Sequence, residues 1–516
     1  MKKVLCIAVC LMLVLTGCNI GGGGAYVPTG DGLTWDEGAP GNNGANTPES
    51  EQVLSLTYYA DRSMNPYACA DFTNRALFSL LYQGLFAVDR EYQVFPILCK
   101  GYTVSQDMKT YTFYLEEATF SDGSPVTAED VTASLLAAKD SSYYSGRLTH
   151  VTAVVAGGDG SVTVSLSVAC ENLPILLDIP IVKASETKAA RPLGTGPYTI
   201  ESTASGGLRL RRRTNWWCSA QMLVTASSIA LIPAQNPAQI RDEFQFGDLS
   251  FVCADPGSDH YADYRCDYEL WDSENGIFLY LACNMESPVF SNPNIRTALT
   301  YAIDRDTLVK NYYRGFARSA TLPASPLSPY YNATLASRYG YQATVFAQAV
   351  TDGAMVGQTM VLLVNSDDSL RLRVARQVGA MLTDCGLAVE MKEVSGNSYL
   401  SALRNQEYDL YLGETKLSAN MDLSPFFAGN GALRFGGISD VTMYAMCVES
   451  LANRGNYYTL HQTVMEDGRL CPILFRSYAI YAERGLLTGI TPSRDNMFFY
   501  SLGKTMDDVR LIQENG

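Results

Sequence analysis

The chain has 516 residues, of which 47% are apolar and 18% charged, and its formal net charge is −15. This length allows roughly two to four domains, and the composition is typical of a globular protein. The acidic balance argues against a nucleic-acid partner, because phosphate binding needs clustered Lys and Arg, and against lying flat on anionic lipid. No apolar run of about 20 residues follows residue 18, so the body of the chain is not expected to span a membrane.

The first 18 residues have the pattern of a targeting signal. They read Met-Lys-Lys, then a mostly apolar run over residues 4–15, then Leu-Thr-Gly-Cys at residues 15–18. This pattern predicts a secretory signal peptide over residues 1–17. Its ending resembles a bacterial lipobox, which implies that Cys18 is lipidated, becomes the mature N-terminus and holds the protein on the outer face of a membrane. A plain secretory signal with an incidental cysteine is the alternative.

Residues 18–50 are predicted to be a disordered tether that follows the lipidated cysteine. Nine of the 32 residues in 19–50 are glycine, and no Lys or Arg occurs between Lys3 and Arg62. Such a segment cannot bury apolar area, so it stays unfolded. We expect it to hold the folded body clear of the membrane.

The body begins with a predicted strand at residues 53–59. A half-buried strand is expected where Tyr, Phe and Leu alternate with polar residues over 111–115, followed by a turn at 120–125. A helix should then begin after Thr127, which with Asp130 resembles a capping box. Asn292 followed by proline predicts the start of another helix.

The last third of the chain alternates between strand and helix patterns. Strands are predicted at residues 361–364, 387–394 and 408–412, and helices at 370–385 and 399–404. Alternation of this kind is typical of α/β domains, and we expect largely parallel sheets.

One basic run and the cysteines have structural interpretations. Arg211-Arg212-Arg213 is isolated and favours a solvated strand edge over a binding patch. Of 13 cysteines, two leave with the signal peptide and Cys18 would carry the lipid. The other ten have irregular spacing and no Cys-x-x-Cys pair, which favours free buried thiols over a disulfide framework.

The sequence shows few groups for catalysis or metal binding. Its three histidines, His150, His260 and His461, are far apart, so each is expected to be a surface or hydrogen-bonded residue. Zinc-ligand clusters, a Gly-x-Ser-x-Gly elbow and a P-loop are absent, and we expect neither a cofactor nor a metal. A paired-carboxylate glycosidase stays open, because two acids leave almost no sequence signature.

Four segments together resemble one protein family. They are YTFYLEEATFSDGSPVTAEDV at 111–131, PLGTGPY at 192–198, LYLACNMESPVFSNPNIRTALTYAIDR at 279–305, and the C-terminal residues 471–492. They are similar to segments of the family 5 extracellular solute-binding proteins, the oligopeptide-, dipeptide- and nickel-binding subunits of ABC importers. The resemblance extends over about residues 51–516.

The resemblance implies an α/β fold of the two-lobed periplasmic-binding-protein type (class II or cluster C), with an extra small domain and a ligand cleft between the lobes. Lobe 1, or domain I, would combine three segments, and the small domain II and lobe 2, or domain III, would each be continuous. The implied boundaries are 51–80, 185–260 and 470–516 for lobe 1, 81–184 for domain II, and 261–469 for lobe 2.

The resemblance also implies a function. The protein would be a lipid-anchored substrate-binding subunit on the extracytoplasmic face of the cell membrane, in a periplasm or at a cell surface. It would bind peptides between its lobes, deliver them to an ABC permease and its ATPase, act as a monomer and perform no chemistry. A binder of another solute (an oligosaccharide or a metal chelate), a non-transport peptide sensor and a secreted enzyme are the alternatives.

Site residues follow from the same resemblance. Peptide-binding members pair the ligand's α-ammonium with a carboxylate in a region that corresponds to residues 408–427, where Asp422 is the best candidate; a helix N-cap is an equal alternative for it. Glu414 stands where the family usually has Trp, and it is a candidate for a second cation. The further ligand-binding candidates are Asn65, Tyr67, Tyr59 and Asn284.

Overall fold

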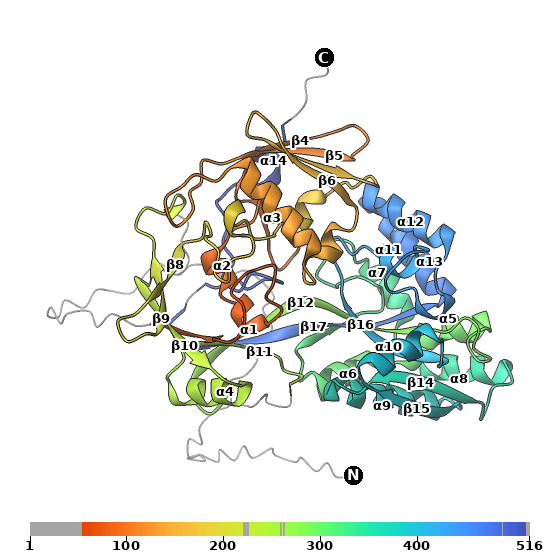
Figure 1. The fold of residues 1–516 in the computed structure, drawn as a ribbon. Coiled ribbons are helices and arrows are strands. Elements are labelled where there is room, and N and C mark those ends of the chain that lie inside the picture. Colours follow the sequence, from red (N-terminus) through yellow and green to blue (C-terminus); the bar gives the residue numbers. More distant parts are fainter. Residues whose placement is uncertain (1–53, 220–225, 259–260, 262–263, 488, 512–516) are drawn as a thin grey trace, which may run out of the picture. The chain divides into compact units, whose positions relative to one another are not determined.

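The structure is a computed structural model that describes residues 54–219, 226–258, 261, 264–487 and 489–511. The predicted signal peptide, Cys18, the tether and His260 lie outside these described residues. The described residues all belong to one compact unit (Figure 1). Within the described part of the chain, no helix is both long enough and apolar enough to cross a membrane.

A large mixed sheet organises this unit. Its described strands lie in the order β15-β14-β16-β12-β17-β11-β1-β10-β9-β8, and β13 pairs with β17. The bounds in that order are Ala388–Val394, Thr359–Asn365, Leu410–Lys416, Tyr268–Cys283, Leu470–Glu483, Phe251–Ala254, Leu54–Tyr59, Ser228–Ala234, Leu208–Arg212 and Tyr198–Ser202, with β13 at Ala317–Ser319.

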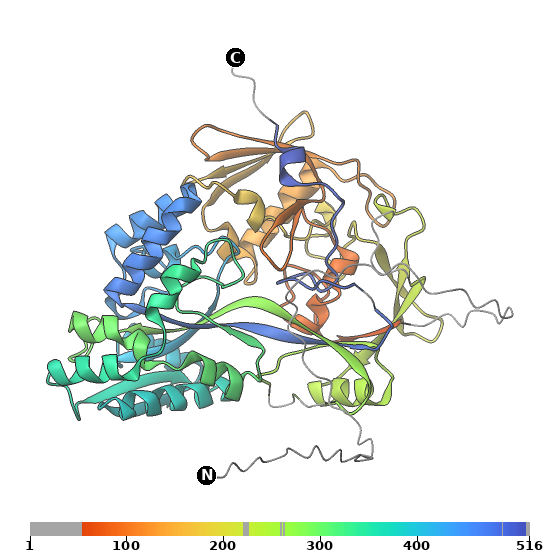
Figure 2. The same ribbon diagram turned by 180° about the vertical axis from the view of Figure 1, so that it is seen from behind.

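The two longest strands, β12 and β17, form the middle of this sheet. They run antiparallel across the molecule, with β14, β15 and β16 on one side and β1, β8, β9, β10 and β11 on the other (Figures 1 and 2). The expectation of largely parallel sheets is therefore wrong. Among the described strands of the large sheet, the parallel pairs are β1 with β10 and β11, and β14 with β15 and β16. Parallel strands must be joined by a crossover, whereas antiparallel strands need none. β8 and β9 are joined directly as an antiparallel hairpin, and β12 pairs antiparallel with β17, which lies almost 200 residues later in the chain.

Two smaller antiparallel sheets complete the strands. β4 (Cys99–Val104), β5 (Thr110–Leu115), β7 (Val162–Leu166) and β6 (Val151–Ala156) form one, and β2 (Phe86–Val88) and β3 (Val94–Pro96) the other. Helix α3 (Ala128–Asp140) contacts β6 and β7. The predicted strand at 111–115 is confirmed, since Tyr111 and Phe113 are buried. The capping box of Thr127 and Asp130 is also present at the start of α3.

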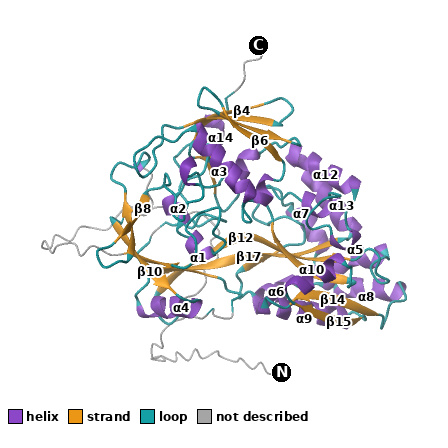
Figure 3. Cartoon of the chain, in the orientation of Figure 1, coloured by secondary structure: helices purple, strands orange, loops and turns teal. Residues whose placement is uncertain are grey.

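The longer helices gather mostly in the second half of the chain, where α9 packs against β14 and β15 (Figure 3). The predicted helix starts are confirmed: Asn292 caps α5, and α9 and α10 overlap the predicted ranges. The remaining helix bounds are α1 Phe72–Arg75, α2 Phe78–Leu81, α4 Pro237–Phe246, α5 Pro293–Ala302, α6 Arg305–Tyr312, α7 Ala333–Ala336, α8 Ala343–Asp352, α9 Ser369–Asp384, α10 Gly396–Arg404, α11 Ser424–Phe427, α12 Val441–Ala452, α13 Tyr457–Asp467 and α14 Met506–Val509. Short 3-10 helices are η1 Ser145–Leu148, η2 Leu173–Leu176, η3 Ala184–Glu186, η5 Ser337–Tyr339, η6 Phe435–Gly437 and η7 Arg454–Asn456.

Arg213 corrects the interpretation of the basic run. It is buried, and its guanidinium donates to the carbonyl oxygens of Thr195 (3.2 Å) and Gly196 (3.1 Å) and to those of Thr119 (3.1 Å) and Phe120 (2.8 Å). β9 ends one residue earlier and lies between β8 and β10, so it is not an edge strand. Arg213 therefore joins two loops, which we call the arginine junction: residues 119–120 and 195–196.

The glycine of the arginine junction is required by close packing. A Cβ on Gly196 would lie 2.4 Å from the carbonyl carbon of Leu81, closer than any real Cβ contact. The amide of Gly196 donates to the Leu81 oxygen at 2.9 Å. This contact gives a physical reason for the Gly-Thr-Gly-Pro-Tyr motif at 194–198, which brings two backbones together.

The ten cysteines of the body are all free in the described structure, and eight of them are buried. They behave as small apolar side chains.

Candidate functional site

The candidate site is a cavity of about 480 Å³. Residues 143–150, Ser167, residues 415–433, Tyr444 and Arg494 contribute its lining. Its volume lies within the range of roughly 300–1,000 Å³ that is usual for small-ligand pockets. Segments more than 300 residues apart in the sequence thus meet at one chamber, which we call the charged cavity.

β16 and the loop that follows it bring the side chains of Lys416 and Asp422 to the charged cavity. Lys416 is the last residue of β16, and the next amide, that of Leu417, donates to the Gly276 carbonyl of β12 at 3.1 Å. The loop that follows leads to α11, which begins at Ser424. Asp422 lies in this loop and lines the cavity. The sheet therefore fixes where the loop starts, and the short helix fixes where it ends.

Asp422 has two roles in the structure. Its Oδ1 accepts a hydrogen bond from the Ser424 amide at 2.8 Å, at the start of α11. Its Oδ2 lies 3.1 Å from Nε2 of His150, which also lines the cavity. The N-cap residue of α11 is Leu423, which makes no side-chain cap, so the N-cap alternative for Asp422 is wrong, although Oδ1 does bond the first amide of the helix. The pairing of Asp422 with a ligand ammonium stays a prediction.

A buried set of charged groups lies at the cavity, which Tyr143, Arg147 and Lys416 line. Arg147 pairs with Asp178 and with Asp495. The Lys416 ammonium lies 2.6 Å from Asp495 and donates to the Tyr143 hydroxyl at 2.5 Å. The Asp495 carboxylate is therefore shared, because Tyr143 also donates to it at 2.6 Å.

Burial and neighbouring charges shift the pKa values of Asp495, Asp178 and Lys416. Burial raises the pKa of Asp495, but the charges of Lys416 and Arg147 outweigh burial, so its pKa lies well below the usual value. Burial raises the pKa of Asp178, against the attraction of Arg147. Burial lowers the pKa of Lys416 to about 7, although Asp495 opposes this. Lys416 can therefore gain or lose its charge near neutral pH.

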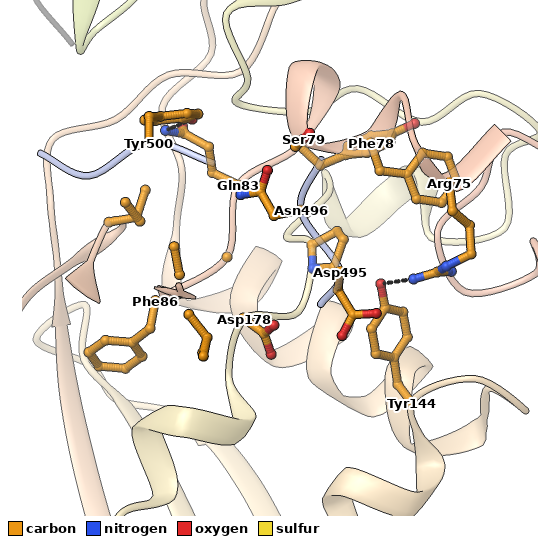
Figure 4. Close-up of a pocket in the computed structure, with 16 residues that line it drawn as sticks. Arg75, Phe78, Ser79, Gln83, Phe86, Tyr144, Asp178, Asp495, Asn496 and Tyr500 are labelled. Carbon is orange, nitrogen blue, oxygen red and sulfur yellow. Dashed lines mark hydrogen bonds between the residues drawn. The ribbon is translucent and has the colours of Figure 1, made fainter. Parts of the chain in front are cut away.

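Asp178 and Asp495 line a second, smaller chamber of about 50 Å³ (Figure 4). On its far side, Gln83 donates to the Tyr500 hydroxyl at 2.8 Å. Arg75 donates to the Tyr144 hydroxyl at 2.6 Å, and its guanidinium carbon lies 3.3 Å from the centre of the Tyr143 ring. This chamber has room for a few water molecules and no more.

Glu414, the second acidic candidate, lies in an internal ion network. It pairs with Arg371 at 3.0 Å and with Arg476 at 2.9 Å, and Arg476 also contacts Asp255 at 2.7 Å. Glu414 does not line the charged cavity. The structure gives it two cations of the protein itself, and the proposal that it binds a ligand cation has no support from this arrangement.

The other candidates are distributed over the molecule. Asn65 donates to the carbonyls of Thr187 and Ala189, and the Tyr67 hydroxyl donates to the Pro180 carbonyl at 2.7 Å. Asn284 donates to the Tyr408 carbonyl at 2.8 Å and so anchors a loop. Tyr59 lines a separate cavity of about 320 Å³. Of the six candidate ligand-binding residues, only Asp422 lines the charged cavity.

Two histidines have environments that the sequence did not indicate. His150 lines the charged cavity, as described above. His461 is fully buried in α13, and neither of its ring nitrogens has a hydrogen-bond partner among the described residues, so the expectation of a surface or hydrogen-bonded histidine is wrong for it. Burial lowers its pKa to about 3, which keeps the ring neutral.

Sequence reasoning missed Arg147 and Arg494, although both line the cavity. No local pattern marks them, because each comes from a different segment and only the fold brings them together. In the described residues, no group of three His, Cys, Asp or Glu side chains could hold a metal ion.

Comparison with known proteins places the chain in a family. Residues 93–431 match the model of the bacterial extracellular solute-binding proteins, family 5. The glutathione-binding protein GsiB of Salmonella typhi is 27% identical over 283 residues, which cover 52% of this chain and 55% of that protein. The match thus spans about half the length of these curated relatives.

Two solved structures show the same fold. The ABC transporter substrate-binding protein CtaP of Listeria monocytogenes aligns with a TM-score of 0.71 at 17% identity, over 88% of this chain and 99% of that one. The oligopeptide-binding protein AppA of Bacillus subtilis, in complex with a nonapeptide, aligns with a TM-score of 0.61 at 18% identity, over 87% and 98%. The fold is that of the two-lobed periplasmic binding proteins. The chain belongs to the bacterial extracellular solute-binding proteins, family 5.

Proposed function

We propose that the protein is the extracytoplasmic substrate-binding subunit of an ABC importer, and that it binds a short peptide in the charged cavity. It would deliver the peptide to a membrane permease with its ATPase, and it would carry out no chemistry itself. Membership of the solute-binding family supports this proposal, as does the similarity to a glutathione-binding protein and to a peptide-bound structure. The lipidated Cys18 would anchor a monomer to the outer face of the membrane.

The observation that carries the proposal is the lining of the charged cavity. Asp422 offers a carboxylate, while Arg147 and Lys416 offer positive charges, within one chamber of about 480 Å³. A peptide carries an ammonium and a carboxylate and has a polar backbone between them. A chamber that presents both signs of charge suits such a zwitterion better than it suits a neutral sugar.

Asp422 can exchange its partner without losing its structural role. Oδ1 remains bonded to the Ser424 amide, whereas the partner of Oδ2 among the described residues is the side chain of His150. A peptide ammonium could replace His150 at Oδ2, and the buried carboxylate would stay paired throughout.

Native mass spectrometry of the full-length protein, purified in detergent from cells grown in peptide-rich medium, tests the proposal. We expect co-purified peptides of defined length. Asp422→Asn should reduce peptide binding at least tenfold, because asparagine retains the oxygen that accepts a hydrogen bond from the Ser424 amide but lacks the negative charge. Asp368→Asn is the matched control, since Asp368 likewise accepts from a helix amide, that of Arg371 at 2.9 Å, and lies outside the cavity lining.

An empty protein that also shows no thermal shift with a peptide library would contradict the peptide proposal and favour a sugar, a chelate or a sensor role. The anchor is tested by the same spectra. A mass increase at Cys18 that disappears in Cys18→Ala, together with release of that variant from the membrane, would support lipidation. An unmodified Cys18 would favour the plain secretory signal.

A further inference from the structure

His150 reaches the charged cavity from the hairpin of β6 and β7. It stands directly before β6, and its carbonyl oxygen accepts a hydrogen bond from the Ser167 amide at 2.9 Å, beside the pairing of Val151 with Leu166. Its side chain is 18% exposed and lines the cavity. The pairing of the two strands therefore fixes the backbone from which the imidazole ring enters the cavity.

The two ring nitrogens of His150 have different partners. Nε2 lies 3.1 Å from Oδ2 of Asp422, and Nδ1 lies 3.5 Å from the Ser167 hydroxyl. An ionised carboxylate can only accept hydrogen bonds, so a neutral ring carries its proton on Nε2 here. A hydroxyl can donate or accept, so Ser167 suits Nδ1 both without and with a second proton. The surroundings thus accommodate the neutral and the charged ring without rearrangement.

Asp422 has one oxygen available for exchange. Its side chain is 8% exposed, and Oδ1 accepts from the Ser424 amide at 2.8 Å. It is the one acid among the described residues that line the cavity. A ligand cation that pairs with Asp422 therefore meets His150 at Oδ2.

Apart from Asp422, the charged side chains that the described structure places around the ring are cations. They are Arg147, Lys416 and Arg494, which line the same cavity, and Lys139 of α3, which donates to the adjacent Val151 carbonyl at 2.5 Å. These charges disfavour a second proton on the ring, whereas the Asp422 carboxylate favours it. A protonated His150 therefore depends on the same carboxylate that a ligand ammonium would use.

Two phenols and two thiols also lie around this pair. They are Tyr143 and Tyr444 of the lining, and the buried Cys170 and Cys447 close to Asp422. Burial raises the pKa of Cys170 to about 12, and it also raises the pKa of Cys447. Phenols are ordinarily neutral between pH 5 and 8. These four groups therefore do not compete for the carboxylate.

The charge of the ring decides how easily Oδ2 can be taken over. Histidine is the side chain whose charge ordinarily changes between pH 5 and 8. A protonated ring binds the carboxylate through a charge-assisted hydrogen bond, which is roughly twice as strong as a neutral one. A ligand ammonium must displace this bond and then lies beside a like charge. The proton and the ammonium thus oppose each other at one carboxylate, and each lowers the affinity of the protein for the other.

We propose that His150 competes with the ammonium of the ligand for Asp422, so that the charged cavity loses affinity for its ligand as the pH falls. The inference rests on the proposed function and adds its regulation. His150 holds the buried carboxylate while the cavity is empty, and it must give up Oδ2 when a peptide binds. The cavity would therefore bind best near neutral pH and release its solute in acid.

The test measures binding of a library of random tripeptides, with free amino and carboxyl termini, to the full-length protein at pH 7.0 and pH 5.5. Equilibrium dialysis with mass spectrometry gives the apparent affinity. Both termini of a peptide stay largely charged between these pH values, so a change in affinity reports on the protein. We expect binding to be about tenfold weaker at pH 5.5.

Two variants fix the charge at position 150. His150→Gln retains a donor but cannot take up a proton, so it should bind no less tightly at pH 5.5 than at pH 7.0. His150→Lys carries a permanent cation and should bind weakly at both pH values. Lys416→Met is the control, because it removes the other titrating side chain of the lining. Its affinity should still fall in acid, at least as steeply as that of the wild type.

The outcomes separate this inference from the proposed function. Equal affinity of the wild type at both pH values, or the same fall in His150→Gln, would overturn the inference and leave the peptide proposal intact. Tight binding by His150→Lys at pH 7.0 would also overturn it. If no tripeptide binds to the wild type or to the variants at either pH value, the peptide proposal fails and the inference falls with it.

Discussion

Arg213 and Arg494 are both buried arginines without a carboxylate of their own, yet their surroundings differ. Arg213, in the arginine junction, donates to four carbonyl oxygens and to the Thr119 hydroxyl. Arg494 donates to one carbonyl and keeps two buried nitrogens without a partner. The first lies between two loops, and the second lies against a cavity.

The difference teaches that the burial of a charged side chain does not by itself indicate a binding site. Backbone carbonyls can satisfy a whole guanidinium, and then the residue holds the fold together. Where buried donors remain without a partner, the fold does not compensate the guanidinium in this way. The predictions below separate these two cases.

The largest effect is expected at the arginine junction. Arg213→Met should lower the free energy of unfolding by about 3 kcal/mol or more, because it leaves buried carbonyls of both loops without a donor. Urea unfolding monitored by circular dichroism measures this. Arg211→Met is the control, since the Arg211 side chain is 59% exposed, and its change should stay within about 0.5 kcal/mol. Equal effects of the two substitutions would show that the junction is not structural.

A smaller change in the free energy of unfolding is expected for a substitution at Arg494 than for one at Arg213. Arg494→Met should leave the free energy of unfolding of the ligand-free protein within about 1 kcal/mol of wild type, because Arg494 donates to a single carbonyl and its nearest carboxylate, that of Asp495, keeps Lys416 and Arg147 as partners. The same unfolding experiment measures this. A loss as large as that of Arg213→Met would mean that Arg494 is a structural residue after all.

The smallest effect concerns the pH dependence of binding at Lys416. Its pKa is about 7 in the ligand-free protein, and a bound carboxylate should raise it because the ammonium gains a partner. Binding at pH 8 should therefore take up a proton, and the affinity should fall about tenfold or less per pH unit above 7. Calorimetry in two buffers with different ionisation enthalpies measures the uptake.

The control for this prediction is Lys416→Met, which should abolish the proton uptake. In the ligand-free protein, the lowered pKa of Lys416 makes the unfolded chain bind more protons than the folded one between pH 7 and the ordinary lysine value of 10.5. Lys416 therefore adds stability as the pH rises through this window. A binding affinity that does not change between pH 7 and 9 would contradict the role of the ammonium.

Much of the local structure could be predicted from the sequence, because it depends on neighbouring residues. The capping box at Thr127 and the helix start at Asn292 were predicted correctly, since each is decided within about one helical turn. The pairing of β12 with β17 could not be predicted in this way. Neither strand carries a local signal for a partner almost 200 residues away, and the expectation of parallel sheets failed there.

The lining of the charged cavity could be predicted from the sequence only in part. Asp422 was found because a single loop resembles the ligand-binding loop of a family, and the structure does place it in the cavity lining. Arg494 carries no such signal, because its place depends on a bulge of β12 at Gly276, which makes room for the guanidinium, and on the partners that Asp495 already has. Accounting for hydrogen bonds requires coordinates, whereas a capping residue requires only its neighbours.

The central pairing of β12 with β17 also determines the order in which the protein can fold. β17 ends at residue 483, so the middle of the main sheet cannot form until most of the chain is available. Arg494, which lines the charged cavity, and Asp495, which pairs with Arg147 and Lys416 of its lining, come later still. Contacts of such long sequence separation slow folding, because loop closure must come first. The binding site is therefore assembled at the end of folding, and the emerging chain cannot capture a solute before it is nearly complete.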